Sequence, residues 1–147
     1  MPKEAAHSVI IDASQKDCYD AICDFESYPE WQKVISKVNV WEHYPDGRPK
    51  VVEYFLLALV KQIRYVIDYT YNDDDPSLHW TYVEGDINDV EGHYLFEDMG
   101  DGSTKATYQL TLTFSMYIPG KIMDALNQQV MKGSVIALKR RVEAMLQ

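Results

Sequence analysis

The chain has 147 residues, which is the length of one domain, and 46% of them are hydrophobic against 25% charged, as in ordinary globular proteins. Its 14 Lys and Arg against 23 Asp and Glu give a net charge of −9, and such a surface repels nucleic-acid phosphates and anionic lipid headgroups. No apolar run approaches the ~18 residues of a membrane span. We therefore expect a single domain over residues 1–147 that binds no nucleic acid and does not insert stably into a membrane.

The two cysteines indicate the compartment. Cys18 and Cys23 fall in a predicted helix, where five residues separate them by ~7.5 Å of rise and roughly 140° of rotation, so they cannot pair. Neither has the spacing of a zinc or thioredoxin motif. The first seven residues lack the apolar core of a signal peptide. We expect a cytoplasmic protein with reduced cysteines.

The first third of the chain predicts one strand and two short helices. Residues His7–Asp12 are rich in β-branched side chains and indicate a short strand. Ser14 is a good N-cap for a first helix, with Asp17 as an acidic residue in its first turn. Pro29 ends that pattern and, beside Glu30, favours a second short helix.

From Val34 onward the hydrophobic period is two for about eighty residues. Turn signals such as Pro45-Asp46-Gly47 and Gly100-Asp101-Gly102 separate the segments, so consecutive strands are antiparallel neighbours. The predicted strands are Val34–His43, Pro49–Leu59, Gln62–Tyr71, Leu78–Val83, Ile87–Glu97 and Lys105–Met116.

After Ile118-Pro119-Gly120, the chain predicts one long helix of about 26 residues. This helix has two apolar stripes, and one of them falls from large side chains to Gly133, Ala137 and Ala144. The order of elements predicts an α+β fold with the sheet curled around this helix. The small residues indicate either a cavity between helix and sheet or a close approach of the two.

Tyrosine dominates the aromatic residues, with 11 Tyr against 4 Phe and 3 Trp, and several tyrosines alternate onto the predicted concave face. Buried hydroxyls need partners, which a partly wet pocket supplies; the alternative is that they reach solvent at the sheet rim. We take the inward-facing positions as candidate ligand contacts: Tyr65, Ile67, Tyr69, Trp80, Tyr82, Asn88, Tyr94, Tyr108, Leu110, Leu112, Ile122, Leu126 and Val130.

Several short motifs occur in an order that resembles a known family. They are Asp24-Phe25-Glu26-Ser27-Tyr28-Pro29-Glu30-Trp31, then Asp46-Gly47-Arg48-Pro49, then Trp80-Thr81-Tyr82-Val83-Glu84-Gly85-Asp86, then Val90-Glu91-Gly92-His93-Tyr94. In this order they resemble the START-related (SRPBCC) superfamily of polyketide cyclases, dehydrases and lipid-transfer proteins. The chain is most similar to small bacterial cyclase/dehydrase-like members, and more distantly to coenzyme Q-binding proteins.

The resemblance implies a helix-grip fold, in which a seven-stranded antiparallel sheet wraps around the C-terminal helix and encloses a cavity for an apolar ligand. It does not by itself imply a catalyst, because one fold hosts many functions. We expect no cofactor.

Catalysis would need an inward carboxylate as general base or acid, and Glu84 and Glu53 are the candidates, with Asn88 as a further polar group. The four histidines are scattered over different strands, so we expect no metal site. Three hypotheses remain open: a carrier of a hydrophobic molecule such as a lipid, quinone or polyketide, a cofactor-independent cyclase or dehydratase, and a protein-interaction module. The protein is expected to be a monomer or a homodimer.

Overall fold

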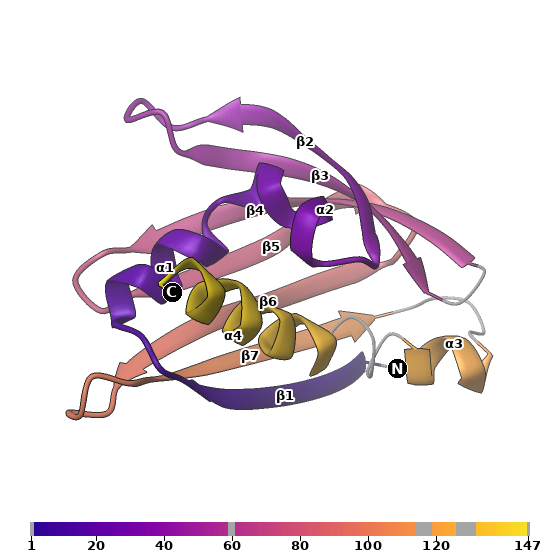
Figure 1. The fold of residues 1–147 in the computed structure, drawn as a ribbon. Helices are drawn as coiled ribbons and strands as arrows, with labels where there is room; N and C mark the ends of the chain where they lie inside the picture. Colours follow the sequence, from indigo (N-terminus) through magenta and orange to yellow (C-terminus); the bar gives the residue numbers. More distant parts are fainter. Residues whose placement is uncertain (1, 59–60, 114–118, 126–131, 147) are drawn as a thin grey trace.

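The computed structural model describes residues 2–58, 61–113, 119–125 and 132–146, and it shows one antiparallel sheet with helices across its concave face (Figure 1). The order of strands in the sheet is β1-β7-β6-β5-β4-β3-β2. The strands are β1 (Pro2–Ile11), β2 (Ile35–His43), β3 (Pro49–Ala58), β4 (Lys61–Asn72), β5 (Ser77–Gly85), β6 (Asp89–Asp98) and β7 (Thr104–Thr113). This α+β architecture confirms the predicted fold class.

Between β1 and β2 lie two α-helices joined by a 3₁₀ turn: α1 (Gln15–Ile22), η1 (Phe25–Ser27) and α2 (Tyr28–Trp31). The Ser14 hydroxyl accepts a hydrogen bond from the backbone N–H of Asp17, as expected of an N-cap. Cys18 and Cys23 are free, and burial raises their pKa values to about 11 and about 12, so neither is a reactive thiol.

The predicted C-terminal helix is described in two pieces, α3 (Gly120–Ala125) and α4 (Gly133–Met145); residues 126–131 lie outside the described part of the chain. On α4, Val135, Leu138 and Val142 are buried against β1, β7 and α1. The small-residue stripe therefore does not face the sheet. Gly133 and Ala137 instead line a surface groove between α2 and α4.

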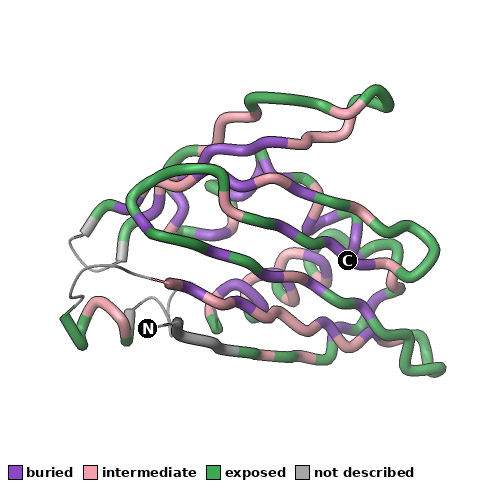
Figure 2. Tube along the Cα trace, turned by 180° about the vertical axis from the view of Figure 1, so that it is seen from behind, coloured by how far each residue is buried: buried purple, intermediate pink, exposed green. Residues whose placement is uncertain are grey.

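Alternation along the strands separates a buried concave face from a more polar convex face (Figure 2). On β6, for example, Val90, Tyr94 and Phe96 are buried, whereas Glu91 and Glu97 are exposed. The same two-residue period holds on β7. The observed orientation of these two strands therefore agrees with the one predicted from the sequence.

The alternation fails at one point in β5. Ile67 on β4 pairs with Tyr82, but the next residue, Val66, pairs with Glu84, so Val83 is an extra residue in a β-bulge. Two residues farther, Gly85 has a φ of +143°, and a Cβ there would collide with the carbonyl oxygen of Arg64. Only glycine fits this close approach of β5 to β4.

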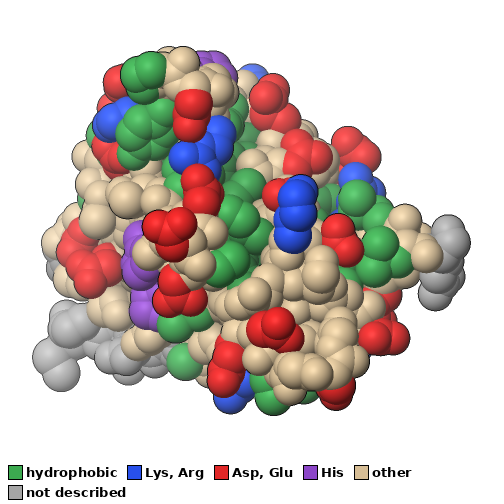
Figure 3. Space-filling model, turned by 90° about the vertical axis from the view of Figure 1, so that its left-hand side faces the viewer, with side chains coloured by type: hydrophobic (Ala, Val, Ile, Leu, Met, Phe, Trp, Pro, Cys, Tyr) green, Lys and Arg blue, Asp and Glu red, His purple; other side chains and the backbone are tan. Residues whose placement is uncertain are grey.

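The turns at one end of the sheet hold much of the negative charge. Figure 3 views the left-hand end of Figure 1 and shows acidic side chains in clear excess over basic ones. The run Asp73–Asp75 belongs to the turn between β4 and β5, where the Asn72 side chain accepts hydrogen bonds from the backbone N–H groups of Asp74 and Asp75. Among the described helices, none is long and apolar enough to cross a membrane.

Candidate ligand-binding cavity

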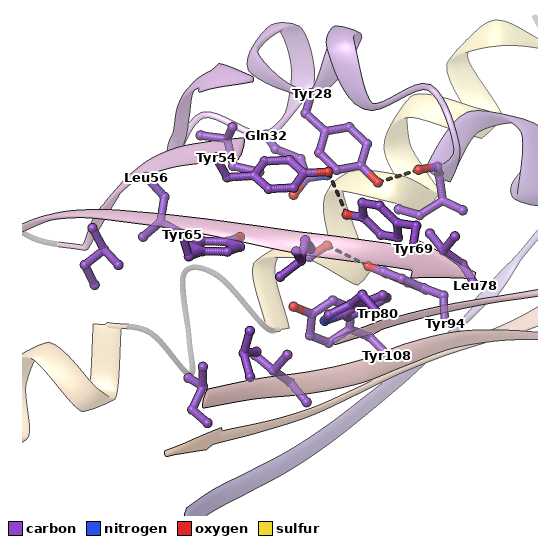
Figure 4. Close-up of a pocket in the computed structure, with 18 of the residues that line it drawn as sticks. Tyr28, Gln32, Tyr54, Leu56, Tyr65, Tyr69, Leu78, Trp80, Tyr94 and Tyr108 are labelled. Atoms are coloured by element: carbon purple, nitrogen blue, oxygen red, sulfur yellow. Dashed lines mark hydrogen bonds between the residues drawn. The ribbon is translucent and has the colours of Figure 1, made fainter. Parts of the chain in front are cut away.

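A cavity of about 70 Å³ lies between the concave face and the helices (Figure 4). Strands β2 to β7 contribute most of its wall, and the helical segments α1, α2 and α4 with their flanking residues contribute the rest. Its lining consists of Ile22, Tyr28, Gln32, Ile35, Tyr54, Leu56, Ile63, Tyr65, Ile67, Tyr69, Leu78, Trp80, Ile87, Val90, Tyr94, Tyr108, Leu110, Leu112 and Ser134.

Some of the hydroxyls that line the cavity are hydrogen-bonded to one another or to the backbone. The Tyr54 and Tyr69 hydroxyls lie 2.6 Å apart, and the Tyr94 hydroxyl lies 2.6 Å from that of Ser134 on α4. Tyr28 donates to the carbonyl oxygen of Ile22. The bond between Tyr94 and Ser134 joins the sheet to α4, and all three bonds satisfy groups whose burial would otherwise be costly.

Three other polar groups in the lining have no such partner. The side-chain nitrogen Nε2 of Gln32 is buried and makes no hydrogen bond, although the residue is only 6% exposed. Among the described residues, the hydroxyls of Tyr65 and Tyr108 also make none, and Figure 4 shows both rings directed into the cavity. A ligand with hydrogen-bond acceptors would satisfy these donors.

The described lining of the cavity is uncharged. None of its described lining residues carries a carboxylate, imidazole, amine or guanidinium group. Burial raises the pKa of Tyr28, Tyr54, Tyr69 and Tyr108 well above the usual value, so these phenols stay protonated at physiological pH. The site can therefore donate hydrogen bonds, but its described side chains include no general base.

Gly92 on β6 positions the indole of Trp80. The two residues are directly opposite each other across β5 and β6. A Cβ at Gly92 would lie 2.7 Å from an indole carbon of Trp80 and 2.5 Å from the carbonyl oxygen of Gln109. The absent side chain lets the indole lie against the backbone of β6, where it forms part of the cavity wall with the ring of Tyr108 at 5.7 Å between centroids.

Most of the candidate ligand contacts predicted from the sequence line this cavity: Tyr65, Ile67, Tyr69, Trp80, Tyr94, Tyr108, Leu110 and Leu112. Tyr82 and Ile122 pack against the hydrophobic core without lining the cavity. Asn88 is exposed, and its neighbour Ile87 points inward instead. Leu126 and Val130 lie outside the described residues.

The structure places both candidate catalytic carboxylates on the convex face rather than in the cavity. Glu53 alternates with the inward-facing Tyr54; its carboxylate accepts hydrogen bonds from Asn39 at 2.8 Å and from Arg64 at 2.6 Å. Both bonds lower the pKa of Glu53, and the bond from Asn39 has the larger effect. Glu84 is turned outward by the bulge in β5 and lies 3.5 Å from the same Arg64. The expectation that either carboxylate points inward does not agree with this geometry.

Sequence reasoning missed the part of the lining that comes from β3 and the helices, notably Tyr28, Gln32, Tyr54 and Ser134. The alternation of Val52, Tyr54 and Leu56 was a usable signal for β3. The short helix α2 gave no such signal, because a single turn has no measurable period. As for metals, the described residues include no cluster of three or more potential ligands.

Comparisons with known proteins identify the family. The family described as polyketide cyclase/dehydrase and lipid transport matches residues 11–139. The chain belongs to this family. No curated protein matches. Among solved structures, a START superfamily protein from Mycobacterium smegmatis is similar with a TM-score of 0.85 and 22% identity, over 97% of this chain and 98% of that one.

Two further structures share the fold. The Zhui aromatase/cyclase from Streptomyces sp. R1128 has a TM-score of 0.85 at 12% identity and covers 100% of this chain and 97% of its own. A protein from Thermus thermophilus has a TM-score of 0.82 at 21% identity, covering 99% of this chain and 100% of its own. At these identities the similarity shows the START-type fold and not a shared reaction.

Proposed function

We propose that this chain binds an apolar small molecule that carries hydrogen-bond acceptors, and that it acts as a carrier of this molecule. The observation that supports the proposal is a cavity whose described lining is uncharged and consists mostly of aliphatic and aromatic side chains, and in which the hydroxyls of Tyr65 and Tyr108 make no hydrogen bond to the described residues. A purely aliphatic ligand would leave these donors unpaired, whereas a quinone, a polyketide or an oxygenated lipid presents carbonyl or hydroxyl oxygens to them.

The size of the cavity limits how the ligand is held. About 70 Å³ is room for roughly five water molecules, since one needs ~10–15 Å³ on this measure. A planar ring system enters such a space after small rotations of the surrounding side chains. We expect binding to move these side chains, and we expect the affinity to depend on the bulk of the residues that line the cavity.

The neutral lining favours a carrier over a cyclase or dehydratase. Proton abstraction needs a base within about 3 Å of the reacting carbon or one water away, and the two candidate carboxylates lie on the opposite face of the sheet. The hydroxyls of Tyr65 and Tyr108 would polarise a substrate carbonyl without removing a proton. A protein-interaction role without any ligand would require neither these hydroxyls nor a cavity. The free cysteines agree with the cytoplasm as the expected compartment.

Fluorescence titration with the neutral probe N-phenyl-1-naphthylamine tests the proposal. The variant Leu110→Trp fills the cavity, and we expect it to weaken binding at least about tenfold. The matched control is Leu95→Trp, since Leu95 is 41% exposed and lies on the convex face. Saturable binding that only the cavity variant loses supports the proposal. No saturable binding, or equal loss in both variants with the fold retained, contradicts it.

Mass spectrometry of an organic extract of the purified protein then identifies the natural ligand. If the extracted or a candidate compound is converted to a product, the cyclase alternative replaces the carrier. The variants Glu53→Gln and Glu84→Gln should not affect such conversion, because neither side chain faces the cavity.

A further inference from the structure

Two residues are shared by the cavity and a groove on the surface. Gln32 and Ser134 line the interior cavity and also line the groove between α2 and α4. These two helices are adjacent in the fold, and Arg141 on α4 lies 3.7 Å from Glu30 on α2. The groove is thus the outer side of the same wall.

The two side chains of this wall differ in how firmly they are held. The Ser134 hydroxyl is bonded to that of Tyr94 at 2.6 Å. The amide nitrogen of Gln32 has no partner, although the backbone N–H of this residue is bonded to Tyr28 and its backbone carbonyl accepts from Ile35. A buried amide without a partner costs free energy, and a hydrogen bond to an acceptor atom of a bound ligand would recover it.

The groove is basic in a protein that is otherwise strongly acidic. It is lined by Lys33, Arg140 and Arg141, while the whole chain carries a charge of −9. Among the described residues, Lys33 and Arg140 form no ion pair, and the pair formed by Arg141 is long. Gly133 and Ala137 also line the groove, and their small size leaves space beside these charges.

We propose that the ligand is an amphipathic anion whose apolar body lies in the cavity and whose anionic group lies in the groove between α2 and α4. The Gln32 amide stands at the junction and donates a hydrogen bond to an oxygen of the ligand. Lys33 and Arg140 interact with the carboxylate, sulfonate or phosphate outside. This inference rests on the proposed function, since it concerns the same cavity, and it specifies the class of ligand and the place where that ligand reaches the surface.

A matched pair of probes tests this inference. 1-Anilinonaphthalene-8-sulfonate and N-phenyl-1-naphthylamine share one aromatic body and differ by the sulfonate group. We expect the wild-type protein to bind the anionic probe more tightly, and we expect raising the salt concentration from about 50 to about 500 mM to weaken the anionic probe alone. The double variant Lys33→Gln/Arg140→Gln should weaken the anionic probe roughly tenfold and leave the neutral one unchanged.

The control is Lys132→Gln, because Lys132 is exposed just before α4 and does not line the groove. Gln32→Leu should weaken the anionic probe several-fold more than the neutral probe, with far-UV circular dichroism to verify the fold. If both probes bind but the groove variants affect them equally or not at all, the inference is overturned while the proposed function stands. If neither probe binds saturably, both fail.

Discussion

The two faces of the sheet are built from the same strands and have opposite chemistry. On β4, Tyr65, Ile67 and Tyr69 line the cavity, whereas Arg64 and Asp68, at alternate positions of the same strand, make ion pairs on the convex face. The charges that the sequence offered for catalysis are all used outside, in a cluster of Arg64, Glu53 and Glu84. The described lining of the cavity thus offers only neutral hydrogen-bonding groups and an apolar surface, whereas these charged side chains pair with one another on the convex face.

The largest effect that we predict on the concave face comes from Gly92→Ala. The added Cβ collides with the backbone of β7 and with the indole of Trp80, and we expect a loss of about 3 kcal/mol in the free energy of unfolding. Urea denaturation measures it. Gly120→Ala is the control, because nothing lies within 4 Å of a Cβ there. Equal stability of the two variants would show that Trp80 is not held as described.

The second prediction separates the bonded from the unbonded hydroxyls within the cavity. Tyr94→Phe leaves the buried Ser134 hydroxyl without its partner, and we expect a loss of about 1–2 kcal/mol in stability. Tyr108→Phe removes a hydroxyl without a partner among the described residues, so thermal and urea unfolding should change by less than about 0.5 kcal/mol. A reversed order would contradict the hydrogen-bond assignment.

The third prediction concerns the convex face. Glu53→Gln removes the charge that Asn39 and Arg64 stabilise, and we expect a loss of about 1 kcal/mol at neutral pH. Because the folded state lowers the pKa of Glu53 from 4.5, the wild type should lose this advantage as the pH falls below that value. Unfolding curves of both proteins from neutral pH down to about pH 3 should therefore converge. Curves that stay parallel would show that Glu53 contributes nothing through its charge.

The smallest predicted effect involves the pair of His79 and His93, whose rings face each other across β5 and β6 at 5.3 Å between centroids. Burial, followed by the neighbouring His79, lowers the pKa of His93, against opposing effects of Gln109 and Glu91. Its neutral form is therefore favoured by folding, and stability should decline slightly as the pH falls below 6.5. An NMR titration should show that His79→Gln raises the pKa of His93; an unchanged value would refute the coupling.

The concave lining of β4, β6 and β7 could be predicted from the sequence because the two-residue period there is regular and the side chains are large. The order of motifs also predicted the family and the α+β fold. The helical part of the site could not be predicted in this way. Gln32 follows a helix of a single turn. Ser134 is a small polar residue, and its partner Tyr94 lies 40 residues away in the sequence.

The prediction that Asn88 faces inward was wrong because it extended the two-residue period of β6 beyond the start of the strand. Ile87 and Asn88 precede β6, in a segment without regular alternation. The sequence also showed the stripe of small residues at Gly133 and Ala137, but it could not show whether this stripe faces the sheet or the surface groove. Only the three-dimensional arrangement of α2 and α4 decides that.

The irregular pairing at Val83 has a chemical consequence for the whole molecule. On a regularly pleated strand Glu84 would lie opposite Tyr65, and its carboxylate would point into the apolar cavity beside the tyrosine rings. The extra residue Val83 keeps the Glu84 carboxylate on the solvent-exposed face of the sheet. Removal of one residue that follows Glu84, rather than of Val83 itself, would restore regular pairing with Glu84 opposite Tyr65. The cavity of this fold could then acquire a proton-transferring group without a change to any side chain of its wall.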